Sequence, residues 1–153
     1  MNKFNNYSNE DLLKGINSLC RQILKDSYKP DLIIGVLRGG AVPGVYLSHW
    51  LECPMATLEW STRDNAVGQN FDDRIKFALN RNSNILFVDD ICDSGLTLKQ
   101  IYDYVQENNF IASIKSSVLH YNIGQDLFEP DYYHLEINKN EDRRWVVYPW
   151  EDK

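Results

Sequence analysis

The stretch Ile85-Leu86-Phe87-Val88-Asp89-Asp90-Ile91-Cys92-Asp93-Ser94-Gly95-Leu96-Thr97-Leu98 decides the fold of this 153-residue chain. Its four leading apolar residues are typical of a β-strand that is buried on both faces, as in a parallel sheet. Two carboxylates follow directly, and a turn of small residues then leads toward a helix. Because α/β proteins bind ligands at the carboxyl ends of their strands, we expect Asp89 and Asp90 to contact a ligand at an exposed strand tip.

The turn Asp93-Ser94-Gly95-Leu96-Thr97 ends where a helix is predicted to begin. The unpaired backbone N–H groups of a helix start attract a phosphate. The carboxylates of Asp89 and Asp90 suit the two hydroxyls of a ribose or the solvation shell of Mg²⁺. The segment therefore predicts a site that grips a sugar phosphate at both ends.

This segment resembles the phosphoribosyl pyrophosphate (PRPP) signature of the type I phosphoribosyltransferases, with Ser94 where threonine is usual. The resemblance implies that Asp89 and Asp90 hold the ribose hydroxyls and Mg²⁺. It also implies that Asp93 lies near the base and acts as a general base on the purine proton. The 5′-phosphate would be bound by Ser94, Gly95, Leu96 and Thr97. The plainer interpretation is a buried strand that ends in an Asp-rich turn.

A second loop, Arg38-Gly39-Gly40-Ala41-Val42-Pro43-Gly44, follows the predicted strand Leu32–Leu37. It fits neither the G-x-G-x-x-G fingerprint nor the P-loop. It resembles the pyrophosphate loop of 6-oxopurine phosphoribosyltransferases, in which a strained, often cis, peptide turns an N–H toward the anion. By this resemblance Arg38 and Gly39 contact pyrophosphate. The alternative is a plain strand-to-helix turn with a solvated arginine.

The segment Trp145-Val146-Val147-Tyr148-Pro149-Trp150-Glu151 resembles the C-terminal segment of xanthine-guanine phosphoribosyltransferases. The resemblance implies that Trp145 stacks on the purine, a contact that tolerates several bases because every base has a π-face. It also implies that Val146 offers its backbone groups to the edge of the ring. A role in the core is the alternative for this tryptophan.

Base recognition departs from the family pattern, which carries a lysine after the fifth strand for the purine carbonyl oxygen. Here that region reads Leu119-His120-Tyr121-Asn122-Ile123-Gly124, and Asn122 or Tyr121 falls at the lysine position. A neutral donor gives up a charge-assisted hydrogen bond worth roughly 1.5–3 kcal/mol. Backbone groups near Val146, or Lys115 on the neighbouring strand, are the other sources of carbonyl recognition. His120 is either a plain strand residue or a participant.

Residues 61–70 have almost no apolar spacing and predict a long loop that closes over PRPP as a lid. The family's usual Ser-Tyr pair is replaced there by Ser61, Thr62 and Arg63.

Strands alternate with helices along the rest of the chain, which predicts an α/β domain with a mainly parallel twisted sheet flanked by helices. The resemblance adds a small hood, and we expect one domain over residues 1–153. Apolar spacing predicts helices over 9–26 and 42–51, strands over 55–60 and 111–120, and a short helix or strand over 71–79. The helix after the signature is predicted to pack through Leu98, Ile101, Tyr102 and Val105.

Composition is that of a globular protein, with 43% hydrophobic and 25% charged residues. The net charge of −6 argues against a nucleic-acid or anionic-membrane partner. The chain has no apolar run near the roughly 20 residues of a membrane span and no apparent signal peptide, so we expect a cytoplasmic protein. The three cysteines suggest reduced thiols. Cys92 is either a buried filler or an exposed reactive thiol.

Together these features predict an enzyme of purine salvage that transfers the phosphoribosyl group of PRPP to a 6-oxopurine (xanthine, guanine or hypoxanthine), with Mg²⁺ as cofactor. We expect a homo-oligomer, either a dimer or a tetramer. Two alternatives remain open, a PRPP-binding regulator without catalysis and a phosphoribosyltransferase for another base such as a pyrimidine.

Overall fold

The computed structural model describes residues 2–60 and 71–151. Its core is a sheet of five parallel strands in the order β3-β2-β4-β5-β6. The elements in chain order are β1 (Phe4–Asn6), α1 (Asn9–Lys25), β2 (Leu32–Leu37), α2 (Ala41–Trp50), β3 (Met55–Glu59), α3 (Asp73–Leu79), β4 (Asn84–Cys92), α4 (Leu96–Glu107), β5 (Ser113–Asn122), β6 (Tyr132–Ile137) and β7 (Trp145–Val147). The predicted α/β class with a mainly parallel sheet is confirmed.

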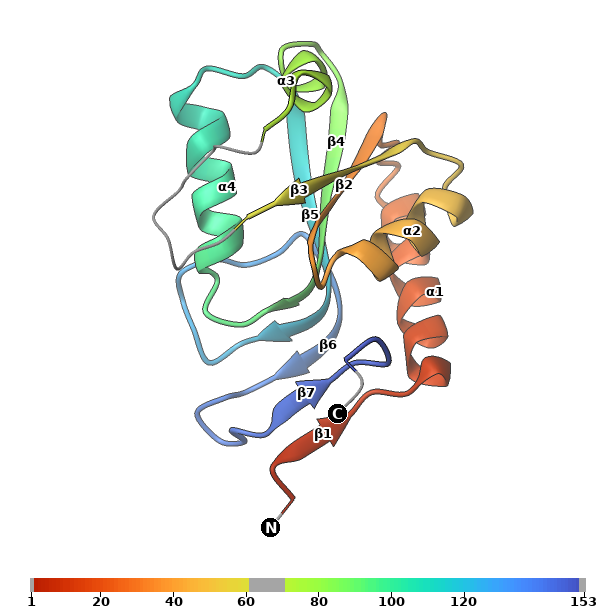
Figure 1. Cartoon of the computed structure of the whole chain (residues 1–153), viewed down its shortest axis with the longest axis vertical. Helices are drawn as coiled ribbons and strands as arrows, with labels where there is room; N and C mark the ends of the chain where they lie inside the picture. Colours follow the sequence, from red (N-terminus) through yellow and green to blue (C-terminus); the bar gives the residue numbers. More distant parts are fainter. Residues whose placement is uncertain (1, 61–70, 152–153) are drawn as a thin grey trace.

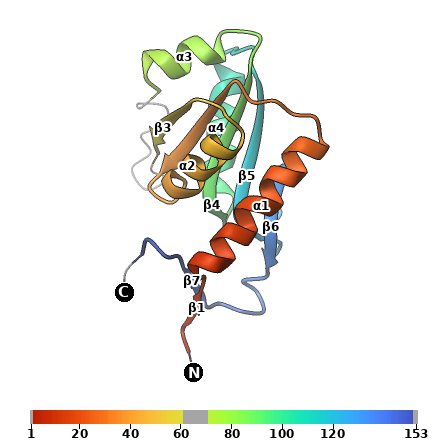
Figure 2. The same ribbon diagram turned by 90° about the vertical axis from the view of Figure 1, so that its right-hand side faces the viewer.

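Helices cover both faces of the sheet, with α1 and α2 on one face and α3 and α4 on the other (Figures 1 and 2). Successive side chains of a strand point to opposite faces, so each central strand contributes side chains to two hydrophobic cores, one on each face of the sheet. Ile33 and Leu86 pack with α1 and α2. Ile34 and Phe87 pack with α3 and α4. This double burial explains why the strands read as continuous apolar runs rather than alternating ones.

Local signals explain where the helices begin. At α1, the Ser8 hydroxyl accepts from the Asp11 N–H at 3.0 Å and the Asp11 carboxylate accepts from the Ser8 N–H at 3.0 Å, which is a capping box. At α3, the Asp72 carboxylate accepts from the Ile75 N–H at 2.9 Å. For residues 71–79 the sequence allowed either a short helix or a strand. The structure shows that this segment contains a capped helix, α3.

The fifth strand is shifted by two residues from its predicted range of 111–120. The N–H groups of Ile111 and Ala112 both donate to the Leu79 carbonyl at 3.0 Å, which holds these residues against the end of α3, in the connection from α4 to β5. At its other end β5 continues to Asn122, which pairs with Ile137 of β6. The extension brings Asn122 into the sheet.

A small second sheet, β1 paired in parallel with β7, lies beyond the carboxyl ends of the central strands (Figure 1). Phe4 pairs with Trp145, and the Tyr7 N–H donates to the Val147 carbonyl at 2.9 Å. This pair occupies the place of the predicted hood. Within the described part of the chain, every helix is too short or too polar to cross a membrane.

Candidate active site

The two signature carboxylates lie at the carboxyl end of β4 and are partly buried, not fully exposed as the sequence suggested. The Asp90 N–H donates to the Asp89 carboxylate at 2.8 Å. Burial and the neighbouring Asp90 raise the pKa of Asp89 well above its usual range. Burial, with a further contribution from Glu151, raises the pKa of Asp90 to about 6. Both carboxylates are therefore costly to ionise without a compensating cation.

A divalent cation beside the pair would offset the cost of ionising both carboxylates. Carboxylate oxygens are ligands that suit Mg²⁺, which binds proteins through one or two carboxylates and takes its other ligands from water and substrate oxygens. The chemistry of Asp89 and Asp90 therefore fits the predicted cofactor.

The turn after the carboxylates has the backbone of an anion loop. Gly95 has φ 81°, which favours glycine, and a Cβ there would approach Gln125 Oε1 to 2.9 Å. The Ser94 hydroxyl accepts from the Leu96 N–H at 3.2 Å. The first turn of α4, which includes Leu96 and Thr97, contains no acidic residue. This helix start is thus electrostatically suited to a phosphate.

The Arg38–Gly40 loop packs directly against the acidic pair. The peptide between Leu37 and Arg38 is cis, as the resemblance implied. A Cβ at Gly39 would overlap the Asp90 carboxylate, and a Cβ at Gly40 would overlap the Val88 carbonyl. Only glycines allow the loop after β2 to approach β4 this closely. Two motifs 50 residues apart in sequence therefore meet at one edge of the sheet.

A small pocket beside the acidic pair carries the residues predicted for the base. It is lined by Asp90, Ile91, Asp93, Lys139, Trp145, Val146, Tyr148 and Glu151. The Trp145 side chain is 52% exposed, whereas Val146 is buried. The Trp145 N–H and the Val147 carbonyl bond to Lys3 and Tyr7, which anchors the strand on both sides of Val146.

The structure distinguishes the two residues, Asn122 and Tyr121, that were expected at the position of the family's carbonyl-recognising lysine. Asn122 faces the site, where its Nδ2 lies 3.1 Å from both the carbonyl and the Oδ1 of Asp93. Its Oδ1 accepts from the N–H groups of Gly124 and Lys139, both at 3.0 Å. Asn122 thus uses its amide to join Asp93 to two loops.

Tyr121, the next residue back, points to the opposite sheet face. Its ring lies 5.1 Å from that of Tyr133 and packs against the α3/α4 core.

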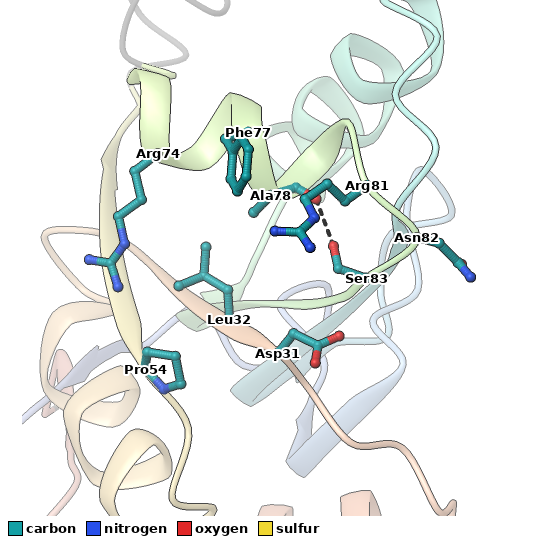
Figure 3. A pocket seen from close by; sticks show the side chains of 9 residues that line it. All are labelled: Asp31, Leu32, Pro54, Arg74, Phe77, Ala78, Arg81, Asn82 and Ser83. Carbon is teal, nitrogen blue, oxygen red and sulfur yellow. Dashed lines mark hydrogen bonds between the residues drawn. The ribbon is translucent and has the colours of Figure 1, made fainter.

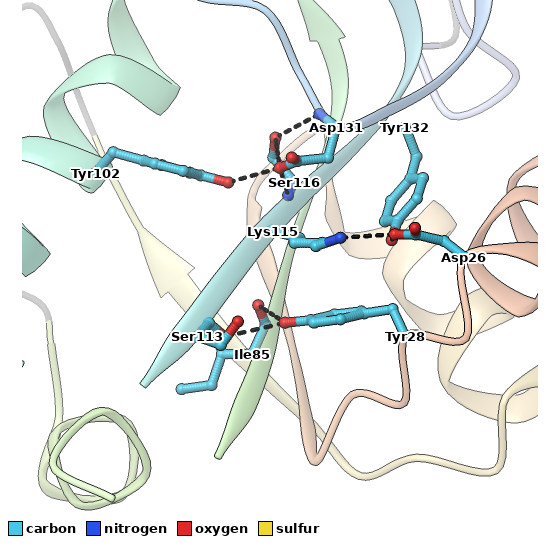
Figure 4. Close-up of polar contacts among 9 residues, drawn as sticks. All are labelled: Asp26, Tyr28, Ile85, Tyr102, Ser113, Lys115, Ser116, Asp131 and Tyr132. Carbon is cyan, nitrogen blue, oxygen red and sulfur yellow. Dashed lines mark hydrogen bonds and ion pairs between the residues drawn. The ribbon is translucent and has the colours of Figure 1, made fainter. Parts of the chain in front are cut away.

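Lys115, the alternative donor for the purine carbonyl oxygen, lies far from the base pocket. Its Nζ pairs with the Asp26 carboxylate at 2.6 Å, beside the rings of Tyr28 and Tyr132 (Figure 4). It sits near the amino end of β5, whereas Asn122 is at the carboxyl end. Of the two alternative sources of carbonyl recognition, Lys115 is therefore excluded by its position, and the backbone groups near Val146 remain.

Sequence reasoning missed two residues of the site, Lys139 and Tyr148. The Tyr148 hydroxyl is buried, donates to the Asp90 carbonyl at 3.1 Å and lies 2.8 Å from Nδ1 of His120. Burial lowers the pKa of His120 to about 4, so this ring is neutral at pH 7. It holds the Tyr148 side chain in place through its contact with the hydroxyl. Val146 and Tyr148 alternate with more exposed residues in the C-terminal segment, a strand pattern that could have indicated that the Tyr148 side chain points inward. No sequence pattern of this kind marks Lys139.

Cys92 is buried, and burial raises the pKa of its thiol to about 12. This favours the filler interpretation over a reactive thiol. The predicted lid residues Ser61, Thr62 and Arg63 lie outside the described residues.

A roomier pocket of about 340 Å³ lies at the opposite edge of the sheet, between α3 and the amino ends of β2 and β4 (Figure 3). Its one carboxylate, Asp31, accepts from the Asn84 N–H at 2.7 Å. Ser83 donates to the Ala78 carbonyl at 2.6 Å. These polar groups are engaged in holding the turn before β4. The signature carboxylates and the Arg38–Gly40 loop lie at the other edge.

Comparison with known proteins agrees with this geometry. Residues 5–153 match the phosphoribosyl transferase domain family. The fold is similar to that of the purine phosphoribosyltransferase from Pyrococcus horikoshii Ot3, at 27% identity and a TM-score of 0.76, covering 99% of this chain and 95% of that one. No curated protein is similar enough in sequence to count as a match.

Two further solved structures share the fold. A hypothetical protein from Neisseria gonorrhoeae with bound ppGpp is 24% identical, with a TM-score of 0.79 over 99% of this chain and 91% of that one. The xanthine-guanine-hypoxanthine phosphoribosyltransferase of Helicobacter pylori is 22% identical, with a TM-score of 0.74 over 97% and 93%. The family match over nearly the whole chain, together with the fold, shows that the chain belongs to the phosphoribosyl transferase domain family and is a type I phosphoribosyltransferase, as its signature predicted.

Proposed function

We propose that this enzyme transfers the 5-phosphoribosyl group of PRPP to a ring nitrogen of a 6-oxopurine, releasing pyrophosphate and forming a nucleoside monophosphate for purine salvage. The observation that carries the proposal is the convergence of the carboxylate pair, the Arg38–Gly40 loop and the half-exposed Trp145 at one edge of the sheet. Trp145 and Asp93 share a pocket wall with Asp90, so a base stacked there lies next to the proposed ribose site.

The reaction breaks the bond from the anomeric carbon to pyrophosphate and forms a bond from that carbon to the purine nitrogen. Its transition state resembles an oxocarbenium ion, so the protein's tasks are positioning, stabilisation of the leaving group and exclusion of water. Asp89 and Asp90 hold the ribose hydroxyls. Backbone N–H groups at Gly39 and Arg38 receive the pyrophosphate. When bound at the carboxylate pair, Mg²⁺ supplies positive charge to the pyrophosphate oxygens.

The 5′-phosphate binds at the start of α4, through backbone N–H groups of the turn and the Thr97 hydroxyl. Asp93 takes the proton from the purine nitrogen. The amide of Asn122, 3.1 Å from Asp93 Oδ1, orients this carboxylate toward the base pocket. Trp145 holds the base by stacking, and backbone groups of Val146 meet its edge.

A base panel tests this function. Purified enzyme is incubated with PRPP, Mg²⁺ and one of hypoxanthine, guanine, xanthine, adenine or uracil, and pyrophosphate release is measured. We expect release with the 6-oxopurines and loss of it in Asp89→Asn. Release with uracil alone indicates a pyrimidine enzyme. PRPP binding without release with any base indicates a regulator.

A further inference from the structure

The loop between β6 and β7 places a lysine in the pocket proposed for the base. Lys139 lines the pocket together with Asp93 and Trp145. Its Nζ lies 5.9 Å from the centroid of the Trp145 ring and donates to the Arg144 carbonyl at 2.7 Å. Lys139 is half-buried, and its ammonium lies over the Trp145 ring.

The position of this lysine is fixed through Asn122. The Asn122 Oδ1 accepts from the backbone N–H of Lys139 at 3.0 Å, and its Nδ2 group contacts Asp93. Asn122 itself is only 6% exposed. A buried amide therefore ties the proposed proton acceptor to the backbone that carries the lysine, and holds both at one pocket.

An ammonium group has three N–H donors, and the Arg144 carbonyl takes one. Within residues 2–60 and 71–151 the other two donors have no hydrogen-bond partner, so they can reach the edge of a ring that stacks on Trp145. A carbonyl oxygen at that edge would accept a charge-assisted hydrogen bond, whereas an exocyclic amino group would present a second donor to the ammonium. The charge thus discriminates between bases that differ only in this group.

We propose that Lys139 is the residue that selects 6-oxopurines, by donating from Nζ to the ring carbonyl oxygen of a base stacked on Trp145. This inference rests on the proposed function of the same site. It also gives Asn122 a positioning role, because this amide contacts both Asp93 and the Lys139 backbone.

The test compares Lys139→Met, which keeps the aliphatic stem but removes the charge, with Lys139→Arg, which keeps a charged donor. Arg143→Gln is the matched control, because it removes an exposed positive charge from the same loop outside this pocket. Calorimetry measures the binding of IMP and AMP to each variant. Binding of PRPP with Mg²⁺ serves as a reference that does not involve the base.

We expect Lys139→Met to bind IMP about 10-fold to 100-fold more weakly, while AMP and PRPP change less than about 2-fold. Lys139→Arg should recover part of the IMP affinity, and Arg143→Gln should behave as the native chain. Equal losses for IMP and AMP, or no loss for either, overturn the inference, because a lysine that only tethers the Arg144 carbonyl would act on both alike. If the native chain releases pyrophosphate with hypoxanthine yet Lys139→Met binds IMP normally, only the Lys139 assignment fails. If the native chain does not bind IMP, the proposed function fails with it.

Discussion

Replacing Asp90 by asparagine should make the free protein more stable while it abolishes the use of PRPP. Burial raises the pKa of Asp90 from 3.8 to about 6. At about 1.36 kcal/mol per pKa unit, ionising this carboxyl in the folded protein at neutral pH costs roughly 2–3 kcal/mol. Because the side chain is only partly buried, solvent screening reduces the expected gain from its removal to about 1–2 kcal/mol.

The pH dependence fixes the sign of the effect. A carboxyl whose pKa is higher in the folded state binds its proton more tightly there, so the folded state loses stability as the pH rises above the unfolded-state pKa, until the carboxyl in the folded protein ionises as well. The native chain should therefore lose stability as the pH rises from about 4 through about 6, and Asp90→Asn should lose less. At pH 7.5 the variant should melt roughly 3–6 °C higher than the native chain, and at pH 4 the difference should be much smaller.

Thermal unfolding at pH 4 and pH 7.5 measures this difference, and pyrophosphate release measures activity. Asp103→Asn is the control, because it removes an exposed carboxylate that pairs with Lys99 at 2.8 Å and should not stabilise the protein. Added PRPP and Mg²⁺ should raise the melting temperature of the native chain but not that of Asp90→Asn. A variant less stable than the native chain at pH 7.5, or a gain that is equal at both pH values, would refute the reasoning.

Three further substitutions probe the rest of the site. Gly39→Ala should abolish PRPP use, because its Cβ overlaps the Asp90 carboxylate, whereas Gly44→Ala should be tolerated, since its Cβ comes close to the flexible end of Met55, at 2.8 Å, and makes only ordinary contact with Gly35 Cα, at 3.5 Å. Steady-state kinetics with varied PRPP would show the difference, and equal activity would count against the close packing. Trp145→Ala should raise the KM for the purine by an amount equivalent to roughly 1–3 kcal/mol, and Trp145→Phe should largely restore the native KM, because stacking requires a ring face. An unchanged KM in the alanine variant would mean that the base binds elsewhere. Asp93→Asn should lower kcat far more than it raises the purine KM, because proton transfer distinguishes the transition state from the ground state; a change in KM alone would argue against a general base.

The sequence was sufficient for the fold because its central strands carry an unambiguous signal. The Ile85–Val88 run is apolar on both faces, and the structure buries it between two helical layers. The ends of β5 were less predictable, because they depend on distant partners. Leu79 holds the residues before the strand, and Ile137 pairs with the last one. Neither contact leaves a local pattern in the sequence.

The location of the candidate site residues was predictable where one short motif defines a loop, and less so where side chains from several elements come together. The acidic pair and the glycine loops could be interpreted from short motifs. Lys139 could not, because it is one lysine in a polar loop until β6, β7 and Asn122 bring it to Trp145. Tyr148 was missed for a similar reason, since its contact with Asp90 spans 58 residues.

The most direct test of the account is ³¹P NMR of the enzyme with PRPP, Mg²⁺ and hypoxanthine. The account predicts that the PRPP resonances disappear as free pyrophosphate and a nucleoside monophosphate appear in equal amounts, and that no change occurs when hypoxanthine is omitted. Loss of PRPP without the monophosphate, or at the same rate without any base, would contradict transfer to a purine.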